Sequence, residues 1–149
     1  FHMAECLTDR RDLVVLTNGI DVGRAMSRNP SNTVMLVAGV MRQDGVSVVG
    51  PLYEPVLRKH QIKTAFVSCK GFSMAAGLME EDEGEAAVKH QMTQLADVTV
   101  ALVDSSKFGQ VFPEPFARAN QVTHLFSDSR LDDQWVEQLQ KSSIVLTRC

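Results

Sequence analysis

A short apolar run near the middle of the chain constrains the fold most. Residues 98–103, Val-Thr-Val-Ala-Leu-Val, are almost continuously apolar and mostly β-branched. Such a run is typical of a strand covered on both faces, the usual situation in the parallel sheet of an α/β domain. It ends in the polar sequence Asp104-Ser105-Ser106-Lys107.

This polar cluster has two interpretations. Ligands of open parallel sheets bind beyond the carboxyl ends of the strands, so Asp104 and Lys107 are candidate binding residues. Asp and Ser are also common helix caps and turn residues, and on that view the cluster only begins the next element. This stretch alone favours neither interpretation.

The strand pattern recurs along the whole chain, and helical patterns lie between its copies. Strands are predicted at 12–18, 33–37, 63–68, 122–128 and 143–146, and helices at 3–7, at 19–27, from Gly50-Pro51, at 85–96 and from Asp132 or Asp133. Alternating strands and helices predict a parallel α/β layer fold, and 149 residues predict a single domain, 1–149.

Three connecting segments carry further signals. Residues 40–42 and 46–49 flank Asp44-Gly45, a turn sequence typical of a hairpin. The segment around Gly77 is predicted to be a loop. Residues 108–120 contain Pro113 and Pro115 and are predicted to be irregular and on the surface.

Composition excludes several classes of protein. A net charge of −3 argues against this chain itself gripping nucleic acid, which requires a basic face. Cys6, Cys69 and Cys149 lie far apart without CxxC spacing, which predicts reduced thiols and no zinc site. No apolar run reaches membrane-spanning length and no signal peptide opens the chain. We therefore predict a cytoplasmic protein with no membrane partner, no metal and no cofactor.

Small or polar residues follow five of the predicted strands, and several such endings on one sheet edge make the floor of a pocket. Glycines let backbone N–H groups approach an anion closely, lysines supply positive charge, and Asn, Asp and Glu bind hydroxyls. Together they predict a site for a phosphorylated polyol or sugar. The candidate binding residues are Thr17, Asn18, Gly39, Lys70, Gly71, Gly77, Asp82, Glu85, Lys89, Asp104, Ser106 and Lys107.

Some of these residues also have a purely structural interpretation. Glu85 and Lys89 lie four apart and fit a surface helix pair worth a few tenths of a kcal/mol. The histidines, including His90 and His124, are better interpreted as surface or packing residues than as catalytic groups. We assign no residue as catalytic.

The chain carries a series of motifs in order: residues 13–18, the strand end at Gly39, Val49-Gly50-Pro51, Ala65-Phe66 with Gly71 and Gly77-Leu78, Glu85-Ala86-Ala87-Val88-Lys89, and Val103-Asp104-Ser105-Ser106-Lys107-Phe108-Gly109. Together these motifs resemble the C-terminal sensor domain of DeoR-family transcriptional repressors. The resemblance implies a fold related to ribose-5-phosphate isomerase, glucosamine-6-phosphate deaminase and CoA-transferase domains. It also implies a homo-oligomer that binds a phosphorylated sugar and signals to an N-terminal helix-turn-helix domain, through which alone operator DNA is bound.

The chain departs from the family pattern in two places. The family has a Gly-Thr-Thr phosphate loop at the start of its first helix, and residues 3–7 resemble the helix that follows this loop. We therefore expect the chain to begin just past the loop, as a truncated sensor domain without the DNA-binding domain. Ala38 stands where the family usually has glycine.

Two other functions remain open at this point. One is an enzyme, a phosphosugar isomerase or deaminase with Glu85 or Asp104 as general base and Lys89 as electrostatic stabiliser. The other is an oligomerisation domain without a ligand, which the missing phosphate loop would explain. The leading hypothesis is a sensor whose ligand shifts an equilibrium between DNA-binding and released states.

Overall fold

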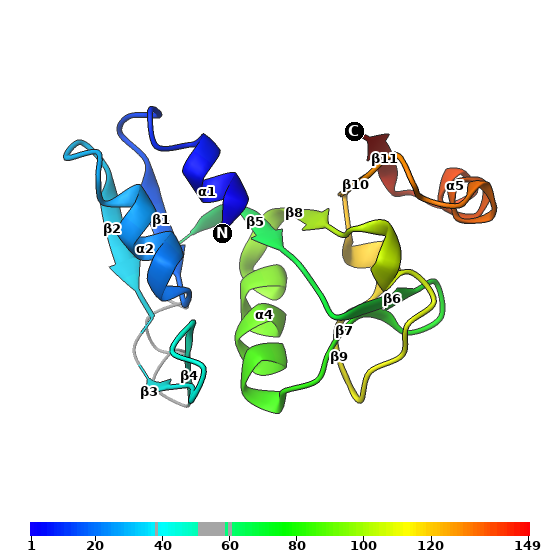
Figure 1. Cartoon of the computed structure of the whole chain (residues 1–149), viewed down its shortest axis with the longest axis horizontal. Coiled ribbons are helices and arrows are strands. Elements are labelled where there is room, and N and C mark those ends of the chain that lie inside the picture. Colours follow the sequence, from blue (N-terminus) through cyan, green and yellow to red (C-terminus); the bar gives the residue numbers. More distant parts are fainter. Residues whose placement is uncertain (38, 51–58, 60) are drawn as a thin grey trace. The chain divides into compact units, whose positions relative to one another are not determined.

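The structure is a computed structural model that describes residues 1–37, 39–50, 59 and 61–149. The chain divides into two compact units, residues 1–60 and 61–149 (Figure 1). Each unit has a parallel sheet and a hydrophobic core of its own. The α/β class predicted from the alternating patterns is confirmed, whereas the single domain remains a prediction.

The first unit begins with two helices that alternate with two strands. They are α1 (His2–Cys6), β1 (Val14–Thr17), α2 (Ile20–Met26) and β2 (Thr33–Leu36). The strands pair in parallel, with Val14 opposite Thr33. Ala25 and Met26 on α2 are buried together with Ala4 of α1 and form the small core of this unit.

A hairpin follows, as the Asp44-Gly45 sequence predicts. Strands β3 (Val40–Met41) and β4 (Val48–Val49) pair antiparallel. Gly45 has a φ of +68°, a left-handed conformation that favours glycine, and Asp44 Oδ1 accepts a hydrogen bond from Val46 N at 3.0 Å. The helix predicted to open at Gly50-Pro51 and the departure at Ala38 lie outside the described residues.

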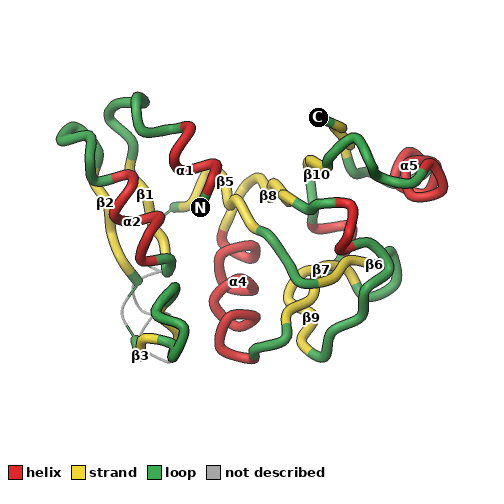
Figure 2. Tube along the Cα trace, viewed as in Figure 1, coloured by secondary structure: helices red, strands yellow, loops and turns green. Residues whose placement is uncertain are grey.

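The second unit contains two sheets (Figure 2). A parallel sheet has the order β11-β10-β8-β5, and an antiparallel sheet has the order β6-β7-β9. The elements in chain order are β5 (Ile62–Val67), β6 (Gly71–Ser73), β7 (Gly77–Glu80), α4 (Glu83–Leu95), β8 (Ala96–Leu102), η1 (Ser105–Lys107), β9 (Glu114–Ala117), η2 (Ala119–Gln121), β10 (His124–Ser127), α5 (Asp133–Gln140) and β11 (Val145–Arg148).

Strand β8, the central apolar run of the sequence, lies between β5 and β10. Its consecutive residues Thr99, Val100 and Ala101 are all buried, so both faces are covered there, as predicted. On one side Ala101 pairs with Val67 of β5, and on the other Val100 pairs with His124 of β10. The run therefore organises this unit by supplying an inner strand of its sheet.

Two predictions about connecting segments are wrong. The segment around Gly77 is not a loop, because it forms the β6–β7 hairpin. Residues 108–120 are not uniformly irregular and exposed, because β9 adds to β7 and buries Phe116 and Ala117. Pro115 is tolerated because β9 is an edge strand and the register shifts at Leu78–Met79 opposite it. Pro115 thus lies in an edge strand, whereas the sequence analysis treats it as a sign of irregular structure.

Candidate functional site

The carboxyl ends of β5, β8 and β10 meet on one side of the second unit. Ser105, just after β8, donates its main-chain N–H at 2.7 Å and its hydroxyl at 3.0 Å to the carboxylate of Asp128, just after β10. Gly109 N donates to Phe72 O at 2.9 Å, which connects the same segment to the chain after β5. We call residues 68–70, 103–107 and 128 the strand-end rim.

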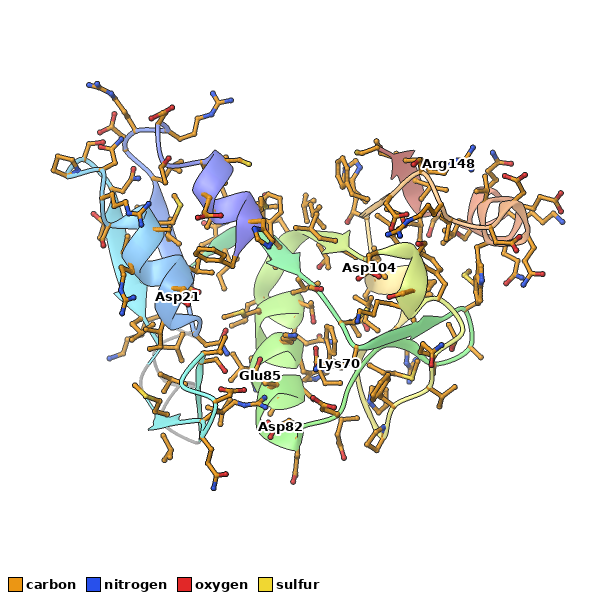
Figure 3. All side chains as sticks on the ribbon, viewed as in Figure 1. Asp21, Lys70, Asp82, Glu85, Asp104 and Arg148 are labelled. Atoms are coloured by element: carbon orange, nitrogen blue, oxygen red, sulfur yellow. The ribbon has the colours of Figure 1, made fainter. Side chains whose placement is uncertain are left out.

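Two predicted hydroxyl-binding carboxylates serve as caps. Asp104 is the N-cap of η1, and its Oδ1 accepts hydrogen bonds from the main-chain N–H of Ser106 at 3.1 Å and from the Ser106 hydroxyl. Asp82 caps α4 and accepts from Glu85 N at 2.9 Å. Figure 3 shows Asp104 at η1 and Asp82 at the first turn of α4. The capping interpretation is therefore correct for Asp104, and the cap at Asp82 is a role that the sequence analysis did not predict. Any ligand role of either residue is additional to capping.

Lys89 extends from α4 to the strand-end rim. Its ammonium donates to Ser68 O at 3.0 Å and pairs with Glu80 Oε1, and the Glu80 side chain is only 5% exposed. The sequence suggested Glu85 as the helix partner of Lys89, but the carboxylate that it binds is Glu80. Nothing in the run of acidic residues at 80–83 distinguished Glu80, because its burial follows from its place at the end of β7.

The other two lysines of the candidate set differ in their surroundings. Lys70 forms an ion pair of 2.8 Å with Glu81, and both side chains are about half exposed. Lys107 is half-buried on η1, and its ammonium has no hydrogen-bond or ion-pair partner within the described ranges. The charge of Lys107 is therefore not neutralised by a carboxylate among the described residues, which makes it the stronger candidate of the two for binding an anion.

Two further groups on the rim have shifted pKa values. Burial raises the pKa of the Cys69 thiol to about 12, an effect that Lys89 partly opposes and Glu80 reinforces. The hydrogen bond from Ser105 N is the main reason that the pKa of Asp128 lies well below its usual range. Cys69 is consequently a neutral thiol and Asp128 a carboxylate at neutral pH, so Cys69 is not an activated nucleophile.

The glycines predicted to let an anion approach have a structural explanation. A Cβ at Gly71 would lie 2.3 Å from Gln110 O, and one at Gly77, whose φ is +80°, would lie 2.0 Å from Ala117 O. Glycine is thus required because neighbouring main chain packs against these positions. Their contact with an anion remains a prediction.

The remaining candidates lie in the first unit. Thr17 Oγ1 accepts a hydrogen bond from Gly19 N at 3.1 Å, and Asn18 Nδ2 donates to Val48 O at 3.4 Å. A Cβ at Gly39 would lie 2.5 Å from Val49 O. These contacts connect β1 and the hairpin within that unit. That Thr17, Asn18 and Gly39 share one ligand with the strand-end rim remains a prediction.

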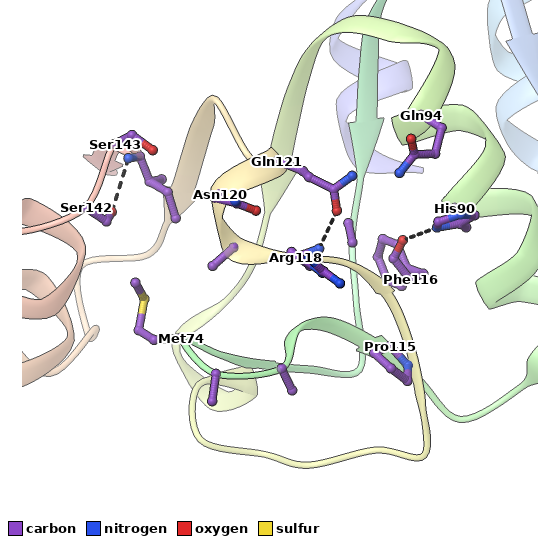
Figure 4. A pocket seen from close by; sticks show the side chains of 15 residues that line it. Met74, His90, Gln94, Pro115, Phe116, Arg118, Asn120, Gln121, Ser142 and Ser143 are labelled. Carbon is purple, nitrogen blue, oxygen red and sulfur yellow. Dashed lines mark hydrogen bonds between the residues drawn. The ribbon is translucent and has the colours of Figure 1, made fainter.

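An open pocket of about 1050 Å³ lies elsewhere in the second unit (Figure 4). It is lined by residues that precede β10 and β11, so it opens at the amino ends of the parallel strands. His90 is one of them; it is an exposed residue whose Nδ1 lies 2.8 Å from Phe116 O. None of the candidate residues lines this pocket, and no sequence signal indicated it.

Two features are absent from the described part of the chain. No three His, Cys, Asp or Glu side chains there gather in a way that would hold a metal ion. None of the helices described is both long and apolar enough to cross a membrane.

The fold and the similarity of the chain to known proteins together assign its class. Parallel strands alternating with helices in both units define an α/β domain protein. The family model of the DeoR C-terminal sensor domain matches residues 1–129. The chain therefore belongs to the DeoR C-terminal sensor-domain family, as its motifs predicted.

The relatives are named as transcriptional regulators. The chain is 31% identical over 147 residues to the uncharacterized HTH-type transcriptional regulator YulB of Bacillus subtilis, which covers 99% of this chain and 57% of that protein. It is 25% identical to the HTH-type transcriptional regulator IolR of B. subtilis (89% and 53% covered) and 26% identical to the HTH-type transcriptional repressor CsqR of Escherichia coli (91% and 55%). The chain thus spans about half the length of the relatives it matches.

Proposed function

We propose that this chain is the effector-binding domain of a transcriptional repressor and that its effector is a phosphorylated sugar bound at the strand-end rim. The observation that carries the proposal is the ammonium of Lys107, which lacks a partner among the described residues on a rim otherwise rich in hydrogen-bonding groups. A phosphate at Lys107 supplies the missing negative charge.

The sugar hydroxyls are matched by groups close to that charge. Asp104 uses Oδ1 for capping, and its Oδ2 has no hydrogen-bond partner in the described part of the chain, so it can accept from a hydroxyl. Lys89 supplies a donor, and Gly71, Ser106 and Lys70 complete the proposed set in the second unit. Gly77, Asp82 and Glu85 are also included in the proposed set of binding residues.

A regulatory role is favoured over a catalytic one because the relatives are named as regulators. In the proposed scheme the domain forms a homo-oligomer, and ligand binding changes the affinity of a separate helix-turn-helix domain for operator DNA. Such coupling is typically worth about 1–3 kcal/mol.

A thermal-shift panel on the natural protein tests the proposal, since a ligand of the folded state raises its apparent stability. The panel contains ribose 5-phosphate, fructose 6-phosphate, the two unphosphorylated sugars and inorganic phosphate. A saturable rise in Tm with a phosphorylated sugar that exceeds the rise with its unphosphorylated counterpart is expected. No rise with any phosphorylated sugar would contradict the proposed effector class, and interconversion of the sugar phosphates during incubation would indicate an enzyme.

A further inference from the structure

Glu80 is a buried carboxylate that capping does not explain. It ends β7, which is buried along its whole length, and the side chain is 5% exposed. A charged group at such a position is costly unless it is paired, and its partner is the Lys89 ammonium, itself 19% exposed. The pair joins the end of β7 to the second turn of α4.

The geometry around Lys89 leaves one donor for a ligand. An ammonium has three N–H donors. Glu80 Oε1 and Ser68 O accept hydrogen bonds from Lys89 Nζ, which lies over the Phe116 ring, 5.6 Å from the ring centre. These contacts from β7, from the end of β5 and from β9 fix the ammonium at the strand-end rim.

The charge balance separates Lys89 from Lys107. The Glu80–Lys89 pair has no net charge, so it adds little to the attraction of an anion. The ammonium of Lys107 has no carboxylate partner among the described residues. Of the two lysines, Lys107 is therefore the counter-charge and Lys89 the oriented hydrogen-bond donor.

We propose that Glu80 is a positioning residue, which holds Lys89 as a hydrogen-bond donor to the uncharged, hydroxyl-bearing part of the ligand and not to its anionic group. This inference rests on the proposed function in one respect, namely that Lys89 contacts a sugar. The hold of Glu80 on Lys89 is independent of any ligand and is tested separately.

The first arm of the test measures the accessibility of Lys89 in the ligand-free natural protein. Acetylation by an N-hydroxysuccinimide ester is quantified by mass spectrometry in wild type, Glu80→Gln and the control Glu83→Gln, which removes an exposed carboxylate three residues along the chain. Lys89 is expected to be protected in wild type and Glu83→Gln, and to become as reactive as the exposed Lys63 in Glu80→Gln. Protection of Cys69 from alkylation shows that each variant is folded.

The second arm measures binding of fructose 6-phosphate, ribose 5-phosphate and inorganic phosphate by calorimetry. The double variant Glu80→Gln/Lys89→Met removes both charges of the pair, and it is expected to weaken the binding of sugar phosphate by about tenfold, because the loss of one oriented hydrogen bond has that order of effect. Since the net charge of the rim is unchanged in this variant, its affinity for inorganic phosphate is expected to stay within about twofold of the wild-type value.

The outcomes separate the two claims. Continued protection of Lys89 in Glu80→Gln overturns the positioning role whatever the ligand does. Equal weakening of inorganic phosphate and sugar phosphate overturns the assignment of Lys89 to the uncharged part. If wild type binds none of the sugar phosphates, the proposed function fails, and the acetylation result still decides whether Glu80 holds Lys89.

Discussion

Ser105 donates both its main-chain N–H and its hydroxyl to Asp128, at 2.7 and 3.0 Å. The two residues are 23 positions apart and follow neighbouring parallel strands, so this pair of hydrogen bonds connects the ends of β8 and β10. Asp128 also accepts from the main-chain N–H of Arg130 at 3.0 Å. The Asp128 carboxylate thus stabilises the turn after β10 and connects it to the segment that follows β8.

We predict that Asp128→Asn lowers the urea midpoint of unfolding at pH 7, because an amide replaces a carboxylate that accepts several hydrogen bonds. The folded-state pKa of Asp128 is lowered mainly by Ser105 N, so its contribution is present above the ordinary carboxyl pKa of about 4 and is lost as pH falls below it. The variant should therefore lose less stability than wild type between pH 7 and pH 3. Asp133→Asn, at an 88% exposed side chain, is the control. Equal midpoints for Asp128→Asn and wild type at pH 7 would refute the prediction.

Cys69 should react far more slowly with iodoacetamide than the other two cysteines of the chain. Cys6 and Cys149 are exposed, whereas burial raises the pKa of Cys69 from 9.0 to about 12. Mass spectrometry after alkylation at pH 8 is expected to show two modified sites and one protected site. In the unfolded chain the Cys69 thiol has its ordinary pKa of 9.0 and ionises more readily than in the folded protein. The free energy of unfolding should therefore decline as pH rises above about 9. Labelling of all three thiols at similar rates would show that this region is open.

Gly77→Ala should cost about 3 kcal/mol or more of unfolding free energy, since a left-handed φ and a collision with main chain act together. A Cβ there would lie 2.0 Å from Ala117 O. Gly45→Ala is the matched control because Gly45 also has a positive φ, +68°, but no atom lies within 4 Å of its Cβ position. The control is expected to lose only about 1–2 kcal/mol. Similar losses in urea denaturation of the two variants would mean that the close packing against β9 is absent in solution.

Ser127→Ala is expected to be neutral or to stabilise the protein by up to about 1 kcal/mol. The Ser127 hydroxyl is buried near the end of β10 and has no hydrogen-bond partner among the described residues. Ser105→Ala removes a hydroxyl that does have a partner, so it should destabilise the protein by about 1 kcal/mol. Thermal unfolding of the two variants makes the comparison, and a clear loss in Ser127→Ala would reveal a partner for its hydroxyl.

Local signals predicted much of the fold. Apolar runs ending in polar residues marked the parallel strands, and Asp132 was correctly expected near the start of α5, where its side chain accepts from Gln134 N at 2.8 Å. The antiparallel sheet was missed because its strands contain Gly71, Gly77 and Pro115, residue types that are typical of turns and loops. Pro115 added a misleading signal, because an edge strand tolerates a residue that would disrupt an inner strand.

The site was predictable in outline but not in its pairings. The motif at 103–109 led directly to a strand end, and Asp104, Ser106 and Lys107 lie there together. Which carboxylate pairs with Lys89 was not predictable, because Glu80 and Lys89 meet only when β7 folds beside α4. The same holds for the glycines, since the carbonyl groups that exclude a Cβ at Gly71 and Gly77 come from segments more than thirty residues away.

Calorimetric titration of the stabilising sugar phosphate into the natural protein and its Lys107→Met variant tests the central claim most directly. Lys63→Met, at an exposed lysine on β5, is the control. We predict that Lys107→Met keeps its fold and loses at least about tenfold in affinity, because it removes the counter-charge for the phosphate, while Lys63→Met binds like wild type. Unchanged affinity in a folded Lys107→Met protein would contradict a sugar-phosphate site at the strand-end rim.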